Sequence, residues 1–232
     1  MNQKVLVILS GGLDSTTLAY HVRRQPLYKL VGAVSIRYGQ RHGKEMSRAR
    51  RTCDRLEIPW YYIDLGILRH RLSASCLTDM ATPVPEGHYS EESMKATVVP
   101  NRNMILLAIA AGVAITHGAG TIVYGAHAGD HAVYPDCRPG FVAATAAALA
   151  LCDYRPVALW APFLRMTKAQ IVAEGIRLQV PFDETWTCYR GEDKACGRCG
   201  TCVERLEAFD IAGATDPLEY SDREFYKTVT SK

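Results

Sequence analysis

Short apolar runs alternate along this chain with longer segments in which apolar and polar residues recur at helical spacing. The runs are rich in Val, Ile and aromatic residues, which is typical of strands buried on both faces of a sheet. Strands are predicted at residues 5–9, 31–36, 60–65, 121–125 and 157–160. Helices are predicted at residues 15–24, 42–56, 103–117 and 138–151. This alternation predicts an α/β fold with a doubly wound, mostly parallel five-stranded sheet.

Two segments depart from the alternation. Residues 66–98 are irregular and polar, with Pro83, Pro85 and Gly87 among them, and they predict a loop over an active site or a dimer contact. Residues 138–151 are almost all alanine and other apolar residues, which predicts either a deeply buried helix or a helix packed against a partner subunit. The second alternative makes the chain a homodimer. We expect residues 1–180 to form the α/β domain and residues 181–232 a small segment packed on it.

Composition narrows the function classes. The chain has 232 residues and a formal net charge of +3 at pH 7, enough length for one large α/β domain and too little charge to indicate a nucleic-acid surface. The basic side chains between residues 37 and 55 fit a solvated helix face. The first apolar run is shorter than the core of a signal peptide, and the longest, at residues 104–116, is too short to span a bilayer. We therefore expect a cytoplasmic protein with no direct nucleic-acid or membrane partner.

The stretch Ser10-Gly11-Gly12-Leu13-Asp14-Ser15 joins the first predicted strand to the first predicted helix. A glycine turn at a helix start presents backbone N–H groups and a positive dipole end to an anion, so it predicts a phosphate site. No lysine follows the glycines, which excludes the Gly-Lys-Ser/Thr loop, and the third glycine of the dinucleotide fingerprint is also absent. Asp14 would repel a phosphate. It therefore either caps the helix or meets phosphates through Mg²⁺.

Cysteines gather near the C-terminus with the spacing C-x7-C-x2-C-x2-C, at Cys188, Cys196, Cys199 and Cys202. Thiolates this close in sequence can converge on one tetrahedral ion, and the neighbouring glycines allow tight turns. Four thiolates fill the coordination sphere of Zn²⁺, so the predicted site is structural. An iron–sulfur cluster and four free thiols are the alternatives.

Further short motifs follow the predicted strands, and together they carry a family resemblance. The glycine stretch resembles the SGGxDS signature of the N-type ATP pyrophosphatases, which hold the pyrophosphate end of ATP while a substrate oxygen attacks the α-phosphorus. The other motifs are Tyr38-Gly39-Gln40-Arg41-His42, Val99-Pro100-Asn101-Arg102-Asn103, Gly125 with Asp130, Tyr134-Pro135-Asp136-Cys137-Arg138 and Glu184-Thr185-Trp186-Thr187-Cys188. With the cysteine array, the ordered set resembles the 7-cyano-7-deazaguanine synthase family over residues 4–202.

The resemblance implies an adenine nucleotide alpha hydrolase-like fold and an ATP-dependent carbon–nitrogen ligase of queuosine biosynthesis. Its substrates would be 7-carboxy-7-deazaguanine and ammonia, its product 7-cyano-7-deazaguanine, and its cofactors ATP, Mg²⁺ and Zn²⁺. A carboxylate reacts with ammonia only after its oxygen becomes a leaving group, which adenylation supplies. Dehydration of the resulting amide to a nitrile requires a second activation of oxygen by ATP.

The residue roles follow from the resemblance and from side-chain chemistry. Arg102 and Lys168 are expected to neutralise phosphate or carboxylate charge, Asp130 and Asp136 to accept from the guanine-like edge, and Tyr38 and His42 to stack on a ring or fill core. The predicted catalytic residues are Asp14, Ser15, Arg102 and Lys168. The predicted ATP contacts are Leu9, Ser10, Gly11, Gly12, Leu13, Asp14, Ser15, Thr16, Thr17, Leu18 and Ala19. The predicted substrate contacts are Tyr38, Gln40, Arg41, His42, Asp130 and Asp136, and the predicted metal ligands are Cys188, Cys196, Cys199 and Cys202.

Other functions remain open on the sequence alone. A transfer-RNA sulfur transferase also adenylates with an SGGxDS loop, but it predicts a separate RNA-binding domain. A glutamine-dependent amidating synthetase needs an amidotransferase domain or partner. A zinc ribbon for nucleic acid or protein is disfavoured because few basic or aromatic residues surround the cysteines.

Overall fold

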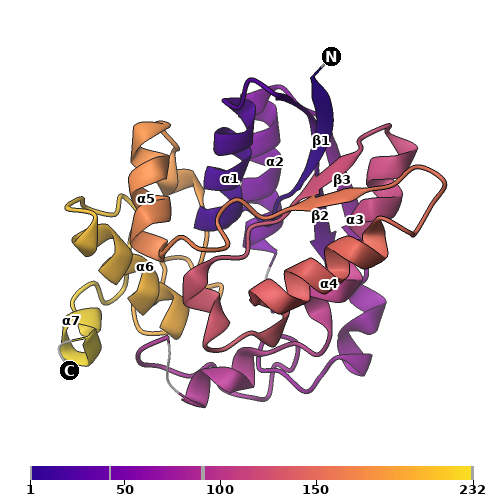
Figure 1. The fold of residues 1–232 in the computed structure, drawn as a ribbon. Helices are drawn as coiled ribbons and strands as arrows, with labels where there is room; N and C mark the ends of the chain where they lie inside the picture. The colour runs from indigo at the N-terminus through magenta and orange to yellow at the C-terminus, as the bar shows by residue number, and fades with distance from the viewer. Residues whose placement is uncertain (1, 42, 90–91, 231–232) are drawn as a thin grey trace.

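A single sheet of five parallel strands forms the centre of the computed structural model, which describes residues 2–41, 43–89 and 92–230 (Figure 1). The strand order is β3-β2-β1-β4-β5. The strands are β1 (Gln3–Ile8), β2 (Tyr28–Arg37), β3 (Trp60–Asp64), β4 (Thr121–Val123) and β5 (Ala158–Trp160). Successive crossovers lead outward from β1 on both sides, so the topological switch point lies between β1 and β4. The predicted fold class is confirmed.

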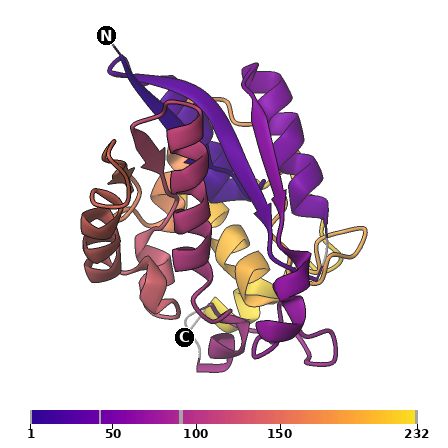
Figure 2. The ribbon, with the colours of Figure 1, turned by 90° about the vertical axis from the view of Figure 1, so that its right-hand side faces the viewer.

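Helices cover both faces of the sheet, as the two views show (Figures 1 and 2). One face carries α1 (Leu13–Arg23), α2 (Lys44–Leu56) and α5 (Lys168–Arg177). The opposite face carries α3 (Arg102–Thr116) and α4 (Pro139–Leu149). Beyond α5 lie α6 (Gly200–Ile211) and α7 (Phe225–Thr230), and short 3₁₀ helices include Gly66–Arg71, Glu92–Thr97, Ala128–His131, Pro135–Cys137 and Phe182–Glu184.

The alternation of side chains along β1 builds the two halves of the core. Val5 and Val7 are fully buried on the side of α1 and α5, whereas Leu6 is fully buried on the side of α3. Because successive side chains of a strand point to opposite faces, one apolar run supplies both cores. Residues of β2 and of the helices complete the core on each face of the sheet. The packed sheet fixes the positions at which the loops leave the carboxyl ends of the strands.

The alanine-rich helix α4 is not deeply buried, so that expectation from its composition is wrong. Only Val142, Thr145 and Leu149 along it are buried, and the alanines on its other side face outward. A helix at the edge of the sheet packs on one side only, and its hydropathy does not reveal how many of its sides other elements cover. Leu151, just beyond it, is 86% exposed.

The C-terminal part of the chain packs against the α1–α5 side of the sheet. Ala208 and Phe209 of α6 belong to the same core as Phe182 and the residues of β1. This packing brings α6 alongside the amino end of α5, where Lys168 lies. Within the described residues, no helix has the length and apolar character needed for a membrane crossing.

Candidate active site and metal centre

The loop after β1 leads directly into α1 and leaves the first amides of that helix without intrahelical acceptors. Gly12 holds the N-cap position, so Asp14 does not cap this helix. The hydroxyl oxygens of Ser10 and Ser15 lie 3.0 Å apart, and the Ser10 amide donates to Ser15 Oγ over 3.1 Å. This compact loop has the form that binds a phosphate group at a helix start.

Gly11 allows the loop to lie against the backbone of α2. Its φ of +86° is a conformation that residues with a side chain rarely adopt. A Cβ at this position would come within 2.2 Å of the Glu45 carbonyl oxygen and 2.7 Å of the Ala49 amide nitrogen. The close approach of these two backbones therefore requires glycine, and it places Glu45 beside the loop.

A cavity of about 230 Å³ opens beyond the carboxyl ends of β1, β2 and β4, which is where ligands bind in doubly wound sheets. Leu9 and Ser10 line it from β1, Tyr38 from β2 and Gly125 from β4. The chain leaves β4 at Val123, two residues before the predicted end of that strand, so Tyr124 and Gly125 are freed to form the cavity wall.

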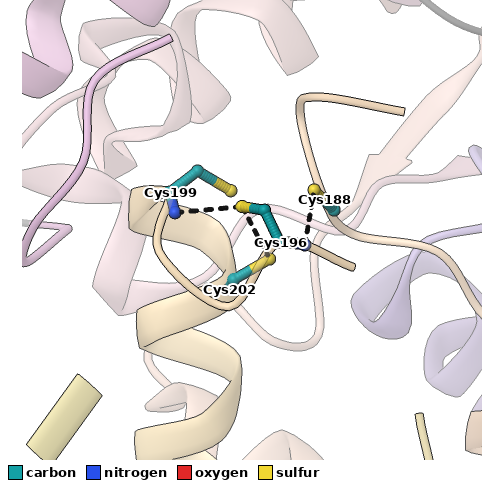
Figure 3. A group of neighbouring side chains, drawn as sticks. All are labelled: Cys188, Cys196, Cys199 and Cys202. Carbon is teal, nitrogen blue, oxygen red and sulfur yellow. Dashed lines mark hydrogen bonds between the residues drawn. The ribbon is translucent and has the colours of Figure 1, made fainter. Parts of the chain in front are cut away.

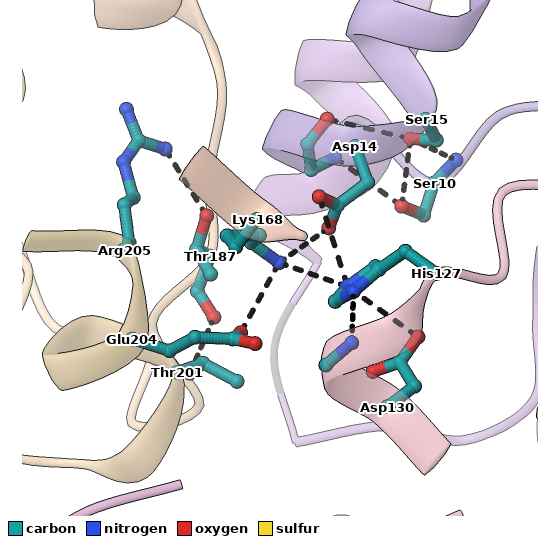
Figure 4. Close-up of polar contacts among 12 residues, drawn as sticks. Ser10, Asp14, Ser15, His127, Asp130, Lys168, Thr187, Thr201, Glu204 and Arg205 are labelled. Carbon is teal, nitrogen blue, oxygen red and sulfur yellow. Dashed lines mark hydrogen bonds and ion pairs between the residues drawn. The ribbon is translucent and has the colours of Figure 1, made fainter. Parts of the chain in front are cut away.

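Asp14, Asp130 and Lys168 line one end of the cavity, and His127 and Glu204 contact them from outside the lining; we call these five residues the charged end (Figure 4). Lys168 Nζ lies 2.7 Å from Asp14 Oδ2 and 3.2 Å from Glu204 Oε2. These three side chains come from α1, α5 and α6. The packing of α6 on α5 thus contributes a carboxylate to the site.

The charges of this end act strongly on one another because they are buried. Burial by itself raises the pKa of Asp14, but Lys168 and His127 outweigh it and lower that pKa below its ordinary value. Burial lowers the pKa of Lys168, yet Asp14 and Glu204 raise it above its ordinary value. Burial raises the pKa of Glu204 above its ordinary value, and the opposing effect of Lys168 does not cancel it. Lys168 is therefore a permanent cation in this site.

His127 is 2% exposed and ties the charged end together. Its Nδ1 accepts from the Gly129 amide over 3.1 Å, so a neutral ring carries its proton on Nε2. That Nε2 atom lies 3.4 Å from Asp130 Oδ2 and 3.9 Å from Asp14 Oδ1. The imidazole thus pairs with Asp130 and lies between it and Asp14, with Lys168 Nζ 3.3 Å from the same Nε2 atom.

The other end of the cavity, which we call the aromatic end, consists of Tyr38, Tyr89, Tyr134 and Tyr189 around Arg102. The guanidinium carbon of Arg102 lies 5.9 Å from the Tyr38 ring centre and 5.4 Å from that of Tyr134. Tyr134 and Tyr189 are joined through their hydroxyl oxygens at 3.0 Å. In the described part of the chain Arg102 forms no ion pair, so its charge is available to a bound anion.

The four clustered cysteines form a candidate metal centre (Figure 3). All are buried, and their sulfur atoms lie within 4.8 Å of one another. Cys196 Sγ and Cys202 Sγ are 3.9 Å apart, close to the roughly 3.8 Å that tetrahedral Zn–S bonds of about 2.3 Å require. The amides of Arg198 and Cys199 both point to Cys196 Sγ, which stabilises a thiolate there. The cluster could hold one tetrahedral ion.

A buried ion pair anchors α6 between this centre and the cavity. Arg205 is fully buried and meets Asp216 with two bonds, Nε to Oδ2 at 2.7 Å and Nη2 to Oδ1 at 2.9 Å. Its remaining donors reach the Phe182 carbonyl oxygen at 2.9 Å and the hydroxyl groups of Thr185 and Thr187, in the segment that precedes Cys188. Every direction of the guanidinium is satisfied, so this pair fixes α6 and the cysteine segment relative to each other.

The structure brings most of the predicted site residues to one cavity, but it places several elsewhere. Ser10, Gly12, Asp14, Ser15, Tyr38, Gln40, Arg102, Asp130 and Lys168 line the cavity. Arg41 instead donates to the carbonyl oxygens of Met80 and Thr82. Asp136 accepts from the Asn103 amide over 3.1 Å at the start of α3, and Leu18 and Ala19 lie in the core. His42 lies outside the described residues.

Several residues of the site were missed from the sequence: Glu45, Tyr89, Tyr134, Tyr189, His127 and Glu204. Tyr134 stands within a motif and Tyr189 next to a predicted ligand, so proximity in sequence could have indicated both. Glu204 follows Cys202 by two positions on a helix, and nothing local indicates its contact with Lys168.

The fold and the site define the class of protein. An SGGxDS loop that joins the central strand of a parallel sheet to a helix, at the edge of a cavity, carries the signature of the N-type ATP pyrophosphatases. These enzymes use ATP.

The sequence comparisons identify the family within this class: the chain belongs to the QueC family, described as queuosine biosynthesis protein QueC, whose model matches residues 4–213. A 7-cyano-7-deazaguanine synthase from Marinobacter nauticus is 54% identical over 220 residues, 95% of this chain and 98% of that protein. One from Methanoregula boonei is 52% identical over 217 residues, 94% of this chain and 99% of that protein. Among solved structures, an NMN synthetase from Francisella tularensis aligns with 100% of this chain and 78% of its own, at 15% identity and a TM-score of 0.49. The family predicted from the sequence motifs is confirmed.

Proposed function

We propose that this chain converts 7-carboxy-7-deazaguanine and ammonia to 7-cyano-7-deazaguanine at the expense of ATP, through adenylation of the carboxylate, an amide intermediate and dehydration to the nitrile. The observation that carries this assignment is that a phosphate-binding loop and a wall of tyrosines with a buried arginine line the same cavity. One wall suits a nucleotide and the other a planar acid. The names of the relatives state the same product.

ATP binds with its phosphates on the loop from Leu9 to Thr17. The buried Asp14 Oδ1 has no hydrogen-bond partner in the described structure, while Asp14 Oδ2 is held by Lys168. An orphaned carboxylate oxygen at a phosphate site fits a Mg²⁺ ion, which takes oxygen ligands; Asp14 would hold the ion, and the ion would offset the negative charge of the phosphates. Lys168 then neutralises negative charge that develops on the α-phosphate, and Ser10 and Ser15 donate to phosphate oxygens.

The deazaguanine binds at the aromatic end. Tyr38 offers a ring face, Arg102 pairs with the substrate carboxylate, and Asp130 accepts from the N–H groups of the guanine-like edge. Asp130 is held for this role on two sides, by His127 and by the Tyr89 hydroxyl at 3.2 Å. Asp136, which is engaged with the start of α3, supports Asn103 and the wall of the pocket rather than the substrate itself.

The chemistry proceeds in two activations. In the first, a carboxylate oxygen of the substrate attacks the α-phosphorus of ATP, pyrophosphate leaves, and ammonia displaces AMP to give the amide. In the second, the amide oxygen attacks the α-phosphorus of another ATP and pyrophosphate leaves; the nitrogen then gives up both of its protons to solvent and AMP leaves, which yields the nitrile. Both activations place an oxygen against the same loop, so one nucleotide site serves both.

We further propose that Zn²⁺ occupies the four-cysteine centre in residues 181–232, while residues 1–180 carry the ATP chemistry. The close sulfur separations favour one ion over a cluster, whose several iron atoms would spread the ligands. The ion is structural because four thiolates leave no open position. Elemental analysis is expected to find about one zinc per chain.

The outward side of α4 supports a homodimer. Its exposed residues are small and apolar, and Leu151 and Tyr154 next to it are strongly exposed. Such a surface is covered at little cost by a second copy of the same helix. A monomeric mass in solution would contradict this assembly.

Purified protein incubated with ATP, ammonium and 7-carboxy-7-deazaguanine tests the proposed function directly. Mass spectrometry is expected to detect first the amide and then the nitrile, each dependent on ATP. Formation of neither product from this acid, with activity on a transfer RNA instead, would favour the sulfur transferase alternative.

A further inference from the structure

Glu45 is a carboxylate in the cavity to which the reaction described above gives no role. It is the second residue of α2 and lines the cavity together with Ser10, Gly12 and Arg102. Its own backbone carbonyl packs against Gly11, so the residue stands directly beside the phosphate loop. In the proposed reaction, the substrate carboxylate that is activated at this loop would therefore lie close to Glu45.

The surroundings of Glu45 orient its carboxylate without neutralising it. Gln40 Oε1 accepts from the Tyr38 amide over 2.9 Å, which leaves the NH₂ group of Gln40 to donate to Glu45. Among the described residues Glu45 forms no ion pair, whereas Asp14 and Glu204 are both held by Lys168. Gln40 therefore fixes the position of the Glu45 carboxylate, while no salt bridge among the described residues occupies it.

The proposed ligase needs a group of this kind. Ammonia exists at neutral pH mainly as ammonium, which has no lone pair and cannot attack a carbonyl carbon. A pocket that uses it must bind the cation and remove a proton next to the acyl adenylate. Among the acidic residues that line the cavity, Asp14 is engaged by Lys168, and Asp130 is held by His127 and Tyr89.

Resting on the proposed function, we infer that Glu45 is the catalytic residue that binds ammonium and accepts its proton. Ammonium gives one proton to the Glu45 carboxylate and becomes ammonia. The ammonia nitrogen then bonds to the carbonyl carbon of the acyl adenylate, the bond from that carbon to the AMP oxygen breaks, and AMP leaves with the electron pair. The nitrogen loses one further proton to solvent, which yields the neutral amide.

The titration of Glu45 suits this role. Burial raises its pKa to about 7, against the opposing effects of Arg102 and Gln40. A base with a pKa near the working pH is the most effective in proton transfer. The other charged or titratable groups that face this region are Arg102 from α3, Tyr38 after β2, and Asp14 and Lys168 across the cavity. Lys168 and Arg102 keep their charge through neutral pH, so they do not produce a transition near pH 7.

The Glu45→Gln variant separates proton transfer from adenylation. It keeps the shape of the side chain but cannot accept the proton. Carboxylate-dependent exchange of pyrophosphate into ATP needs no ammonia and is expected to stay near the wild-type rate. Amide formation from ammonium is expected to fall by about 10²-fold or more, which is the usual contribution of a general base. Hydroxylamine, which is largely unprotonated at neutral pH, is expected to trap the acyl adenylate at a near wild-type rate.

The pH profile and two further variants complete the test. In wild type, kcat/KM for ammonium is expected to show a rise near pH 7 beyond the titration of ammonium itself, and this added rise should vanish in Glu45→Gln. Glu45→Asp should restore part of the ammonium reaction. Glu57→Gln, the same change at the exposed end of α2, should alter nothing.

Two results would overturn the role of Glu45. Equal losses of exchange, hydroxamate and amide in Glu45→Gln would show that it only positions Arg102 or the loop, and unchanged amide formation would show that it has no part in the reaction. Failure of the proposed function is distinguishable, because then wild-type protein itself would show no carboxylate-dependent exchange.

Discussion

Different interactions hold the side chains in place at the two ends of the cavity. At the charged end, five ionisable side chains from different elements hold one another, with Lys168 2.7 Å from Asp14 and His127 fixed by the Gly129 amide. At the aromatic end, tyrosines are joined by hydroxyl contacts around Arg102, which forms no ion pair among the described residues. The side chains of the first end pair mainly with one another and leave Asp14 Oδ1 without a hydrogen-bond partner, while the second end leaves a cation without an ion-pair partner among the described residues. Under the proposed function, this contrast leaves Asp14 Oδ1 open to a metal ion at the first end and Arg102 open to the substrate carboxylate at the second.

The largest effect is expected when Lys168, the central cation of the charged end, is replaced. Lys168→Met should reduce carboxylate-dependent pyrophosphate exchange by about 10²–10³-fold, because a preorganised charge that stabilises the transition state is lost. The exposed Arg165→Met, three residues before it, is the matched control and should exchange like wild type. An unchanged rate in Lys168→Met would remove the charged end from catalysis.

The anchoring of α6, which brings Glu204 to the charged end, can be tested through stability. Arg205→Met leaves Asp216 buried and uncompensated, so the free energy of unfolding in urea should fall by about 3–5 kcal/mol. Arg55→Met breaks the solvent-exposed pair with Glu184 and should leave the free energy of unfolding almost unchanged, because solvent screens that pair. Similar small losses in both variants would mean that the buried pair does not hold α6.

At the aromatic end the expected effect is smaller and confined to one substrate. Arg102→Gln removes the proposed partner of the substrate carboxylate, a charged contact of about 1.5–3 kcal/mol, so the KM for the acid should rise roughly ten- to a hundredfold. The affinity for ATP should change little, because the loop is intact. A loss of ATP affinity with an unchanged KM for the acid would contradict this assignment, because it would show that Arg102 contacts ATP and not the acid.

The parts of the site that could be predicted from the sequence are those in which neighbouring residues act together. The loop from Ser10 to Ser15 and the four cysteines lie close in sequence, so their spacing alone predicted a phosphate site and a cluster of thiols that could hold a metal ion. The alternation of strands and helices also predicted the sheet, since a strand buried on both faces and a crossover helix have different periods.

The rest depends on side-chain direction and on distant packing. Arg41 and Asp136 stand in the expected motifs, yet they turn to backbone groups at Met80 and Asn103. Glu204 meets Lys168 only because α6 packs on α5, a contact between elements distant in sequence. The exposure of α4 likewise follows from its place at the edge of the molecule and not from its composition.

The central claim is that the loop at Gly11 and Gly12 activates an acid bound at the opposite end of the same cavity. Isotope exchange between pyrophosphate and ATP, measured with and without 7-carboxy-7-deazaguanine and without ammonia, tests it most directly. The account predicts exchange that requires the acid and yields AMP on full turnover with ammonium. Hydrolysis to ADP and phosphate, or exchange indifferent to the acid, would contradict it.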